Sequence, residues 1–299
     1  MDDRLAGGTP CRAREGPLMH VDTTSANERL EALSRAWSVS VRRVVETPTS
    51  LVAFGLRGEA RVVLKVVSGP HEEWNAGAVV AAFAGHGMVR ALEHVPGAAL
   101  LEELRPGTPL SDLARSGRDE EASDVIAGVM ADMLSTAPDV HGHASAEHWA
   151  GAFDRYLSDE PAALPSGLVA AGHRTYMVLC DSQEAPRLLH GDLQHYNILL
   201  DEDRGWLAID PKGVVADPAF ELGAVLRNPH GVPELLTATA LERRAGRLAS
   251  GLGLDAHRVL RWTFAQAVLS AIWSVEDGEP LAADAPILDF ARAARSLVE

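Results

Sequence analysis

The sequence predicts an α+β fold in two parts, an N-terminal antiparallel five-stranded sheet with one helix and a mainly helical C-terminal part. Between residues 39 and 104, five runs rich in Val and Leu alternate with turn-forming Pro and Gly and surround one helical segment. From residue 111 onward, apolar residues at helical spacing dominate, and only short strand-like runs interrupt them. We place the boundary at residues 105–109, because Arg-Pro-Gly-Thr-Pro is typical of a hinge.

The N-terminal part is expected to span residues 21–104. It follows residues 1–20, which are rich in Gly, Pro and Arg, lack periodicity and are expected to be a disordered lead. Residues 25–36 predict a short helix with Leu30 and Leu33 on one side. Alternating and Val-rich segments predict the strands. The expected strands are 39–45, 51–56, 61–67, 88–94 and 98–104, and the expected helix is 72–83.

The C-terminal part is expected to span residues 105–299. Polar residues lie at the ends of its short strand-like runs, an arrangement that suits an active site. The expected helices are 111–136, 145–159, 166–182, 217–227, 233–251, 255–276 and 284–298, and the short strands are 187–190, 198–200, 206–209 and 214–215.

Composition excludes several classes of protein. The chain has 299 residues, 46% hydrophobic and 23% charged, which is ordinary for a globular protein. The net charge of −15 argues against nucleic acid and anionic membrane surfaces as partners, since both attract basic patches. It suits a cationic small molecule, although it also serves solubility. We see no secretory signal and no apolar run of ~18 residues, so we expect a cytoplasmic protein, and we favour a monomer.

Lysine is rare in this chain. The 27 basic residues comprise 25 arginines and two lysines, Lys65 and Lys212. Lys65 is followed by Val66 and Lys212 by Gly213, so the phosphate-binding pattern G-x-x-x-x-G-K-[ST] is absent. Any lysine chemistry must use one of these two residues. Biased base composition is the alternative explanation for so few lysines.

One stretch concentrates chemically useful residues. Asp192 and Asn197 lie five residues apart and lead into an apolar strand, and Asp210 follows a second apolar strand thirteen residues later. A hairpin would bring Asn197 and Asp210 together at its open end. This arrangement offers one carboxylate to an alcohol proton, and a carboxylate with an amide oxygen to a hard cation such as Mg²⁺.

These residues fit a family pattern. The H-x-D-x-x-x-x-N stretch at His190–Asn197 resembles the catalytic loop of the protein-kinase-like fold. His-Gly-Asp with a later Asp-Pro resembles the aminoglycoside phosphotransferases. Residues 206–221 and 226–229 resemble the branch that holds streptomycin 6-kinases and hydroxyurea phosphotransferases. The resemblance spans roughly residues 45–280 and implies a bilobal fold and an ATP-dependent kinase acting on an antibiotic hydroxyl.

The resemblance also implies roles for the three residues of this stretch. Asp192 would be the base that accepts the proton of the substrate hydroxyl. Asn197 and Asp210 would hold Mg²⁺ on the phosphates of ATP. Phosphoryl transfer needs positioning and charge neutralisation more than a strong base, so an ordinary aspartate suffices.

In the N-terminal part, the resemblance assigns the nucleotide contacts. Lys65 on the third strand would pair with the α- and β-phosphates, and its acidic partner would be Glu72 or Glu73. Thr49 and Ser50 lie where the nucleotide loop would be, although the turn contains no G-x-G-x-x-G. Residues around Glu102 to Leu104 would meet adenine through their backbone.

Other residues keep two interpretations. Lys212 would touch the transferred phosphoryl group or pair with Asp217 or Glu221. Glu276 and Asp277 would bind a cationic substrate or are ordinary surface charges. The segment Asp217–Glu221 is typical of a helix start, with Asp as N-cap and Pro next. His190 is expected to brace its loop rather than bind metal, and His141, His143 and His148 are expected to be solvated.

Several functions remain open at this point. Streptomycin, which carries two guanidinium groups, is the leading acceptor, at its 6-position. Hydroxyurea or another small alcohol is the alternative within the same fold. A catalytically silent nucleotide-binding module would be expected to lack Asp192 or Asp210, and both are present. A metal-dependent hydrolase would not need Lys65 on a strand of a separate lobe.

Overall fold

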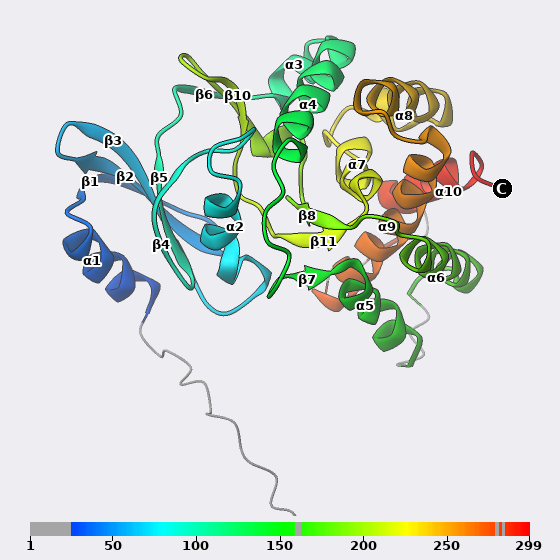
Figure 1. The fold of residues 1–299 in the computed structure, drawn as a ribbon. Helices are drawn as coiled ribbons and strands as arrows, with labels where there is room; N and C mark the ends of the chain where they lie inside the picture. Colours follow the sequence, from blue (N-terminus) through cyan, green and yellow to red (C-terminus); the bar gives the residue numbers. More distant parts are fainter. Residues whose placement is uncertain (1–24, 159–162, 279–280, 283–284) are drawn as a thin grey trace, which may run out of the picture.

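The computed structural model describes residues 25–158, 163–278, 281–282 and 285–299, so the predicted lead at 1–20 lies outside the described residues. The chain forms two lobes, a β-sheet lobe and a larger helical lobe, which meet near residue 105 (Figure 1). This is the α+β, two-lobed architecture that the sequence predicts. No helix of the described residues is long and apolar enough to cross a membrane.

The N-terminal lobe contains the predicted five-stranded sheet, antiparallel throughout, in the order β1-β2-β3-β5-β4. Helix α1 (Ala26–Ala36) packs on one face, and α2 (Ala76–Ala82) lies between the sheet and the helical lobe (Figure 1). The predicted helix 72–83 therefore begins later, after a 3-10 turn at Glu72–Asn75. The strands are β1 (Ser40–Glu46), β2 (Ser50–Arg57), β3 (Ala60–Val67), β4 (Ala91–Val95) and β5 (Ala98–Glu102).

Strand alternation determines which side chains face α1 and which face the helical lobe. On β3, Val62, Leu64 and Val66 are buried in the small core under Leu30 of α1. Because successive residues of a strand point to opposite faces, Lys65 lies on the other face, toward the helical lobe. The sheet thus presents a lysine toward the junction of the two lobes.

Two predicted segments differ in the structure at the start of the helical lobe. Residues 105–109, expected to be a linker, include a short strand, β6 (Pro106–Pro109), that pairs with β9. Proline lacks an N–H group but is tolerated at the edge of a sheet, and β6 is an edge strand. The expected helix 111–136 is split into α3 (Ser111–Arg115) and α4 (Asp119–Leu134) because Gly117 adopts a φ of 83°.

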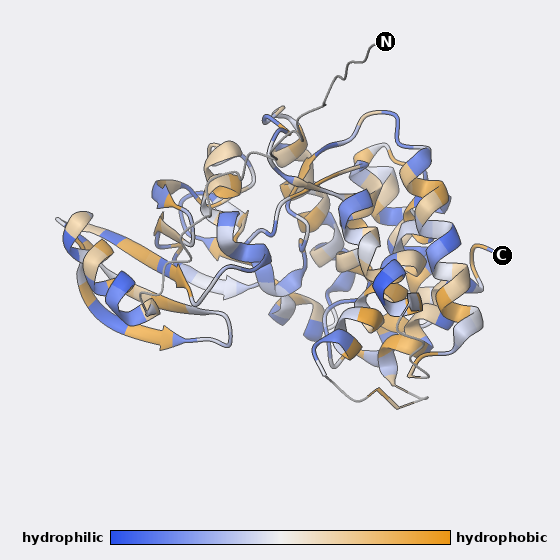
Figure 2. Ribbon diagram, turned by 90° about the horizontal axis from the view of Figure 1, so that it is seen from below, coloured by the Kyte–Doolittle hydropathy of each residue, from blue (hydrophilic) through white to orange (hydrophobic). Residues whose placement is uncertain are grey.

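The remaining helices surround the long helix α9 (Ala256–Glu276), which packs against α6, α7, α8 and α10. Apolar and polar stretches alternate along these helices, as amphipathic packing requires (Figure 2). Helix α8 begins at Ala238 rather than at 233, because the Thr237 side chain caps it by accepting from the N–H of Ala240. The other bounds are α5 (Ala146–Ser158), α6 (Ser166–Asp181), α7 (Pro218–Leu226), α8 (Ala238–Leu252) and α10 (Pro286–Arg295).

Two small three-stranded sheets lie inside the helical lobe. One has the order β10-β9-β6, and the other has the order β7-β11-β8. The predicted strand 88–94 begins only at Ala91, because Met88 forms an isolated bridge with Ala208 of the helical lobe. The bounds are β7 (Ala144–Ser145), β8 (Arg187–Leu189), β9 (Ile198–Asp201), β10 (Gly205–Ala208) and β11 (Val214–Ala216).

Candidate active site

The hairpin of β9 and β10 brings Asn197 and Asp210 together. Ala208 pairs with Ile198, and the N–H of Ile209 donates to the carbonyl of Asn197 at 2.8 Å. Asp210 directly follows with a φ of 62°, a left-handed conformation that non-glycine residues rarely adopt. The open end of the hairpin therefore places an amide and a carboxylate at the junction of the lobes, as the sequence predicts for these two positions.

Asn197 is oriented by the residue expected to be the base. Its Nδ2 donates to the backbone carbonyl of Asp192 at 2.9 Å and contacts the Asp192 Oδ2 at 3.4 Å. This bond directs the amide nitrogen toward Asp192 and leaves the amide oxygen as an acceptor. An amide oxygen beside the Asp210 carboxylate is a donor set that fits Mg²⁺. Among the described residues, no group of three or more His, Cys, Asp and Glu forms a metal site.

His190 is buried and uses both ring nitrogens within the loop. Its Nε2 lies 2.8 Å from the carbonyl of Ile209, to which it must donate, and its Nδ1 accepts from the N–H of Asp192 at 3.2 Å. The carbonyl of His190 in turn accepts from the N–H groups of Lys212 and Gly213, each at 2.9 Å. His190 thus joins the two strand ends, which agrees with the bracing role and not with a metal ligand.

A buried carboxylate lies beneath the same loop. Glu221 on α7 accepts from the N–H of Gly191 at 3.1 Å and from the N–H of Leu193 at 3.0 Å. Burial raises the pKa of Glu221, while the two N–H bonds act in the opposite direction. The sequence placed Glu221 at a helix start, and that start is present: Asp217 caps α7 by accepting from the N–H of Ala219 at 2.7 Å.

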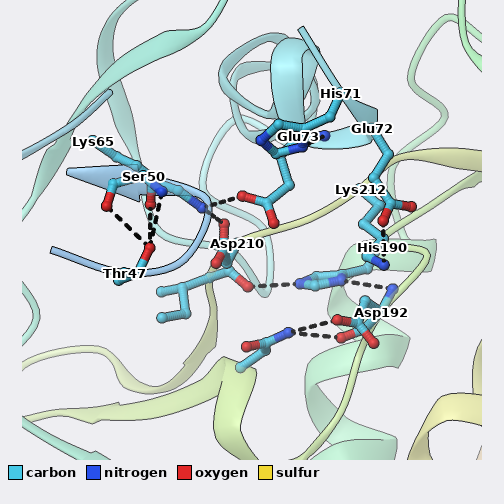
Figure 3. A network of polar contacts seen from close by, with 12 residues as sticks. Thr47, Ser50, Lys65, His71, Glu72, Glu73, His190, Asp192, Asp210 and Lys212 are labelled. Carbon is cyan, nitrogen blue, oxygen red and sulfur yellow. Dashed lines mark hydrogen bonds and ion pairs between the residues drawn. The ribbon is translucent and has the colours of Figure 1, made fainter. Parts of the chain in front are cut away.

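The two lysines pair with adjacent glutamates (Figure 3). Lys65 contacts Glu73 at 2.7 Å and also contacts Asp210, so Glu73 is the acidic partner that the sequence left open between two residues. Burial alone would lower the pKa of Lys65, but the charges and hydrogen bonds of Asp210 and Glu73 outweigh it and raise the pKa, so Lys65 stays protonated. Lys212 pairs with Glu72 at 2.9 Å.

Of the two interpretations of Lys212, the ion pair with Asp217 or Glu221 is wrong in its partner, because Lys212 pairs with Glu72. Asp217 pairs instead with Arg258, and Glu221 is committed to the loop beneath Gly191. The Lys212 side chain instead reaches Glu72 on the 3-10 turn of the N-terminal lobe, while its backbone N–H donates to the His190 carbonyl.

A cavity of about 610 Å³ lies between the lobes. It contains the Lys65–Asp210 pair, and the turn residues Thr49 and Ser50 line one end. Leu104 and the hinge line the other end, and the walls between are apolar, which suits a flat ring joined to a charged tail. The apolar lining includes Val52, Val63, Val80, Val89, Ala99, Leu101, Leu199 and Ile209.

Glu102 also lines this cavity, but its carboxylate has another task. It accepts from the N–H of Arg90 at 2.8 Å and pairs with Arg204, which comes from the turn between β9 and β10. Arg204 further donates to the carbonyls of Gly85 at 2.5 Å and Met88 at 3.2 Å. The hinge is therefore anchored to the hairpin by a residue that sequence reasoning did not select, since no motif marks Arg204.

A second cavity, of about 730 Å³, lies on the far side of the segment 210–213. Asp210 and Pro211 line the first cavity, whereas Lys212 and Gly213 line the second. Trp149 connects this cavity to the loop that carries Asp192, because its ring lies 3.2 Å from the position of a Cβ on Gly191. The lining residues include His71, Glu72, His143, His148, Trp149, Arg155, Lys212, Ser270, Trp273 and Asp277.

Glu276 and Asp277, which the sequence left open between substrate binding and ordinary surface charge, differ in the structure. Asp277 lines the second cavity. Glu276 is held by both of its oxygens on Arg155, at 2.9 and 3.0 Å, so its charge is already paired. His143 and His148 line the cavity as well, whereas His141 is largely exposed. Nothing in the sequence indicated that Trp149 lines this cavity.

The fold and the site together define the class of this protein. A five-stranded sheet with a Lys–Glu pair, a connecting hinge, and a His-Gly-Asp loop followed by a hairpin that ends in an aspartate are arranged as in the protein-kinase-like fold. Solved structures agree. A hygromycin-bound ternary complex of the aminoglycoside phosphotransferase APH(4)-Ia has a TM-score of 0.64 at 17% identity, covering 89% of this chain and 97% of that one. Choline kinase LicA from Streptococcus pneumoniae has a TM-score of 0.63 at 16% identity, covering 91% and 99%.

Sequence comparison defines the family. Residues 32–278 match the aminoglycoside/hydroxyurea antibiotic resistance kinase family, and the chain belongs to that family. Streptomycin 6-kinase of Streptomyces glaucescens is 33% identical, covering 82% of this chain and 81% of that protein. Streptomycin 3''-kinase of Klebsiella pneumoniae is 32% identical, covering 74% and 83%. Hydroxyurea phosphotransferase of Kitasatospora aureofaciens is 32% identical, covering 92% of each.

Proposed function

We propose that this protein transfers the γ-phosphoryl group of ATP to a hydroxyl of a small-molecule antibiotic, with streptomycin as the leading acceptor. One observation carries the proposal: the segment 210–213 separates two cavities, and Asp192 with Asn197 lies on the neighbouring catalytic loop. A donor in the first cavity and an acceptor in the second would meet at this segment. The names of the relatives support this class of acceptor.

The residues of the first cavity suit a nucleotide triphosphate. Lys65 would pair with its phosphates, and the N–H groups of Thr49 and Ser50 would contact them from the turn. Asp210 and the amide oxygen of Asn197 would hold Mg²⁺, which when bound neutralises phosphate charge. The Glu102 carboxylate is paired with Arg204 and is not available to the nucleotide. The adenine ring would therefore contact the backbone between Glu102 and Leu104.

Asp192 would accept the proton of the attacking hydroxyl. Its position is defined from three sides, by the Asn197 amide, by the His190 ring on its own N–H, and by Glu221 on the flanking N–H groups. A silent nucleotide-binding module would not need this arrangement. A metal-dependent hydrolase would not need Lys65 in a separate lobe. Both are therefore weaker proposals than a phosphotransferase.

The acceptor position is the finer part of the proposal. We favour the 6-hydroxyl of streptomycin, supported by two 6-kinase relatives at 33% and 32% identity. A 3''-kinase and a hydroxyurea phosphotransferase are as similar, so these acceptors are the alternatives. We further propose a cytoplasmic protein. We also propose that it is a monomer, since one chain supplies the residues of both cavities.

The test is ADP release measured with streptomycin, other aminoglycosides and hydroxyurea. We expect streptomycin to stimulate release, and we expect phosphorus NMR of the product to show phosphate on the 6-hydroxyl. Phosphate on the 3''-hydroxyl would refute the 6-position and keep the substrate. If only hydroxyurea stimulates ADP release, hydroxyurea and not streptomycin is the acceptor. If no acceptor stimulates it, the antibiotic kinase proposal is refuted.

A further inference from the structure

The adjacent residues Glu72 and Glu73 on one 3-10 turn pair with the two lysines of the chain. The two pairs lie on opposite sides of the segment 210–213, which separates the two cavities. Glu73 holds Lys65 toward the first cavity, and Glu72 holds Lys212 at the second (Figure 3). The first pair is well covered, with side chains 14% and 16% exposed. In the second pair, Lys212 is 23% exposed and Glu72 is 51% exposed. The Glu72 carboxylate is thus an open face of the second cavity.

The Glu72–Lys212 pair is partly exposed, and a pair of this kind contributes little to stability, so its loss costs the fold little. The backbone of Lys212 is fixed, because its N–H donates to the His190 carbonyl at 2.9 Å, so an exchange would move only the side chain. The ammonium also lies 5.9 Å from the centre of the Trp273 ring, on the cavity wall. Lys212 can therefore change its partner without a change in the catalytic loop.

The second cavity offers polar groups that its own residues do not use. His71 accepts from the N–H of Glu73 through Nδ1 at 3.3 Å, so the hydrogen of the neutral ring is on Nε2. That nitrogen is buried and has no partner among the described residues, although His71 lines the cavity. Asp277 faces the same space. The carboxylates of Glu72 and Asp277 can accept hydrogen bonds from a cationic group, whereas the Nε2–H of His71 can donate to an oxygen of the same ligand.

We propose that Glu72 recognises a cationic group of the acceptor, and that this group displaces Lys212, whose ammonium then faces the phosphoryl group as it passes between the cavities. This inference rests on the proposed function. In the transfer itself, the bond from the γ-phosphorus to the ADP oxygen breaks, a bond to the acceptor oxygen forms, and the hydroxyl proton goes to Asp192. Lys212 would balance charge during this step and would form no bond.

The charges favour such an exchange. A guanidinium group binds a carboxylate through two parallel hydrogen bonds, whereas an ammonium acts as a point charge, so a guanidinium competes well for Glu72. A cationic acceptor and a fixed Lys212 would repel each other in one cavity. When the Lys212 ammonium moves to the phosphoryl group, Lys212 pairs with phosphate and the acceptor cation pairs with Glu72. Lys212 would then reach the phosphoryl group only after the acceptor has bound.

Two variants should therefore change acceptor binding in opposite directions. Glu72→Gln removes the carboxylate, and we expect the dissociation constant of streptomycin to rise about tenfold or more. Lys212→Met leaves Glu72 free, and we expect that constant to fall severalfold, while kcat falls about a hundredfold because the charge at the phosphoryl group is lost. Hydroxyurea carries no cation, so Glu72→Gln should change its KM less than about twofold.

The measurements are isothermal titration calorimetry with streptomycin, and ADP release with both acceptors. Matched controls are Asp124→Asn and Arg247→Met, which break an ion pair between α4 and α8 that is remote from both cavities; they should match the unaltered protein. Equal weakening of streptomycin binding by both test variants would show a purely structural ion pair and overturn the inference. So would the absence of streptomycin binding to the unaltered protein and to Lys212→Met. Binding without turnover of any acceptor would instead refute the proposed function.

Discussion

Each carboxylate oxygen of Glu221 lies 3.1 Å from the backbone nitrogen of Gly191, the residue that precedes the proposed base. Leu193, on the other side of that base, donates to the same carboxylate. The turn that carries Asp192 is thus held by a side chain that is itself buried in the core. Its contribution to activity would be one of positioning.

Glu221→Ala should therefore lower both stability and kcat. Two buried N–H groups would lose their acceptor, and each such loss costs about 1–3 kcal/mol of unfolding free energy. We expect the free energy of unfolding from urea denaturation to decrease by about 2–6 kcal/mol. Glu221→Asp keeps a carboxylate and should restore part of kcat. A Glu221→Ala protein with the stability and kcat of the original would contradict this account.

Asp192→Asn should abolish phosphoryl transfer and leave nucleotide binding intact. The amide cannot accept the hydroxyl proton, and general-base catalysis is worth about 10²–10⁴ in rate. The first cavity does not include Asp192 in its lining, so the dissociation constant of a nonhydrolysable ATP analogue should change little. We would compare kcat from ADP release with calorimetric binding. A fully active variant would exclude Asp192 as the base.

Lys65→Arg should fail to replace lysine, in a chain that uses arginine at 25 of its 27 basic positions. Lys65 fits between Glu73 and Asp210 with its side chain only 14% exposed, and a planar guanidinium is larger and differently shaped than an ammonium. We expect kcat/KM for ATP to fall at least about tenfold for Lys65→Arg and further for Lys65→Met. Arg57→Lys, at an exposed pair with Glu93, is the matched control. Equal activity of Lys65→Arg would show that shape is unimportant at this position.

His195 should make the protein less stable in acid. Burial, together with the charge of Arg244, lowers the pKa of His195 to about 3, and neither ring nitrogen has a partner among the described residues. The unfolded chain binds this proton below about pH 6.5, whereas the folded chain resists it, so stability is present above pH 6.5 and is lost as the pH falls toward 3.

The expected contribution is about 1.4 kcal/mol per pH unit, or about 2 kcal/mol between pH 7.5 and 5.0. Other groups also titrate in this range, so the measurement is a comparison. Urea denaturation of His195→Asn should show about 2 kcal/mol less loss over this interval than the unaltered protein. His257→Asn changes an exposed histidine and should follow the unaltered protein. Identical pH profiles for His195→Asn and the unaltered protein would mean that His195 is protonated in the fold.

Much of the fold follows from local patterns. The Val-rich run 61–67 predicted the strand that carries Lys65, and two apolar strands predicted the hairpin that joins Asn197 and Asp210. Local patterns failed where one residue changes the chain direction, as Gly117 does between α3 and α4. They also failed at β6, whose two prolines conceal an edge strand.

Ion-pair partners could not be predicted, because they depend on how separate segments meet. Glu72 and Glu73 are equivalent in sequence, and only the 3-10 turn directs them to different lysines. Arg204 lies in an ordinary turn, and its contacts with Glu102 and the Gly85 carbonyl form only when the two lobes are folded together. Long-range contacts of this kind leave no signal in a single sequence.

The hairpin of β9 and β10 has a length that both of its ends require. At the turn, Arg204 pairs with Glu102 and donates to the Gly85 carbonyl. At the open end, about four residues or roughly 14 Å away, Asn197 and Asp210 lie side by side. A change of hairpin length could keep one end in place only by displacing the other. We therefore expect insertions and deletions to be rejected in this short turn during evolution or engineering, even though it lies on the surface, where loops ordinarily vary in length.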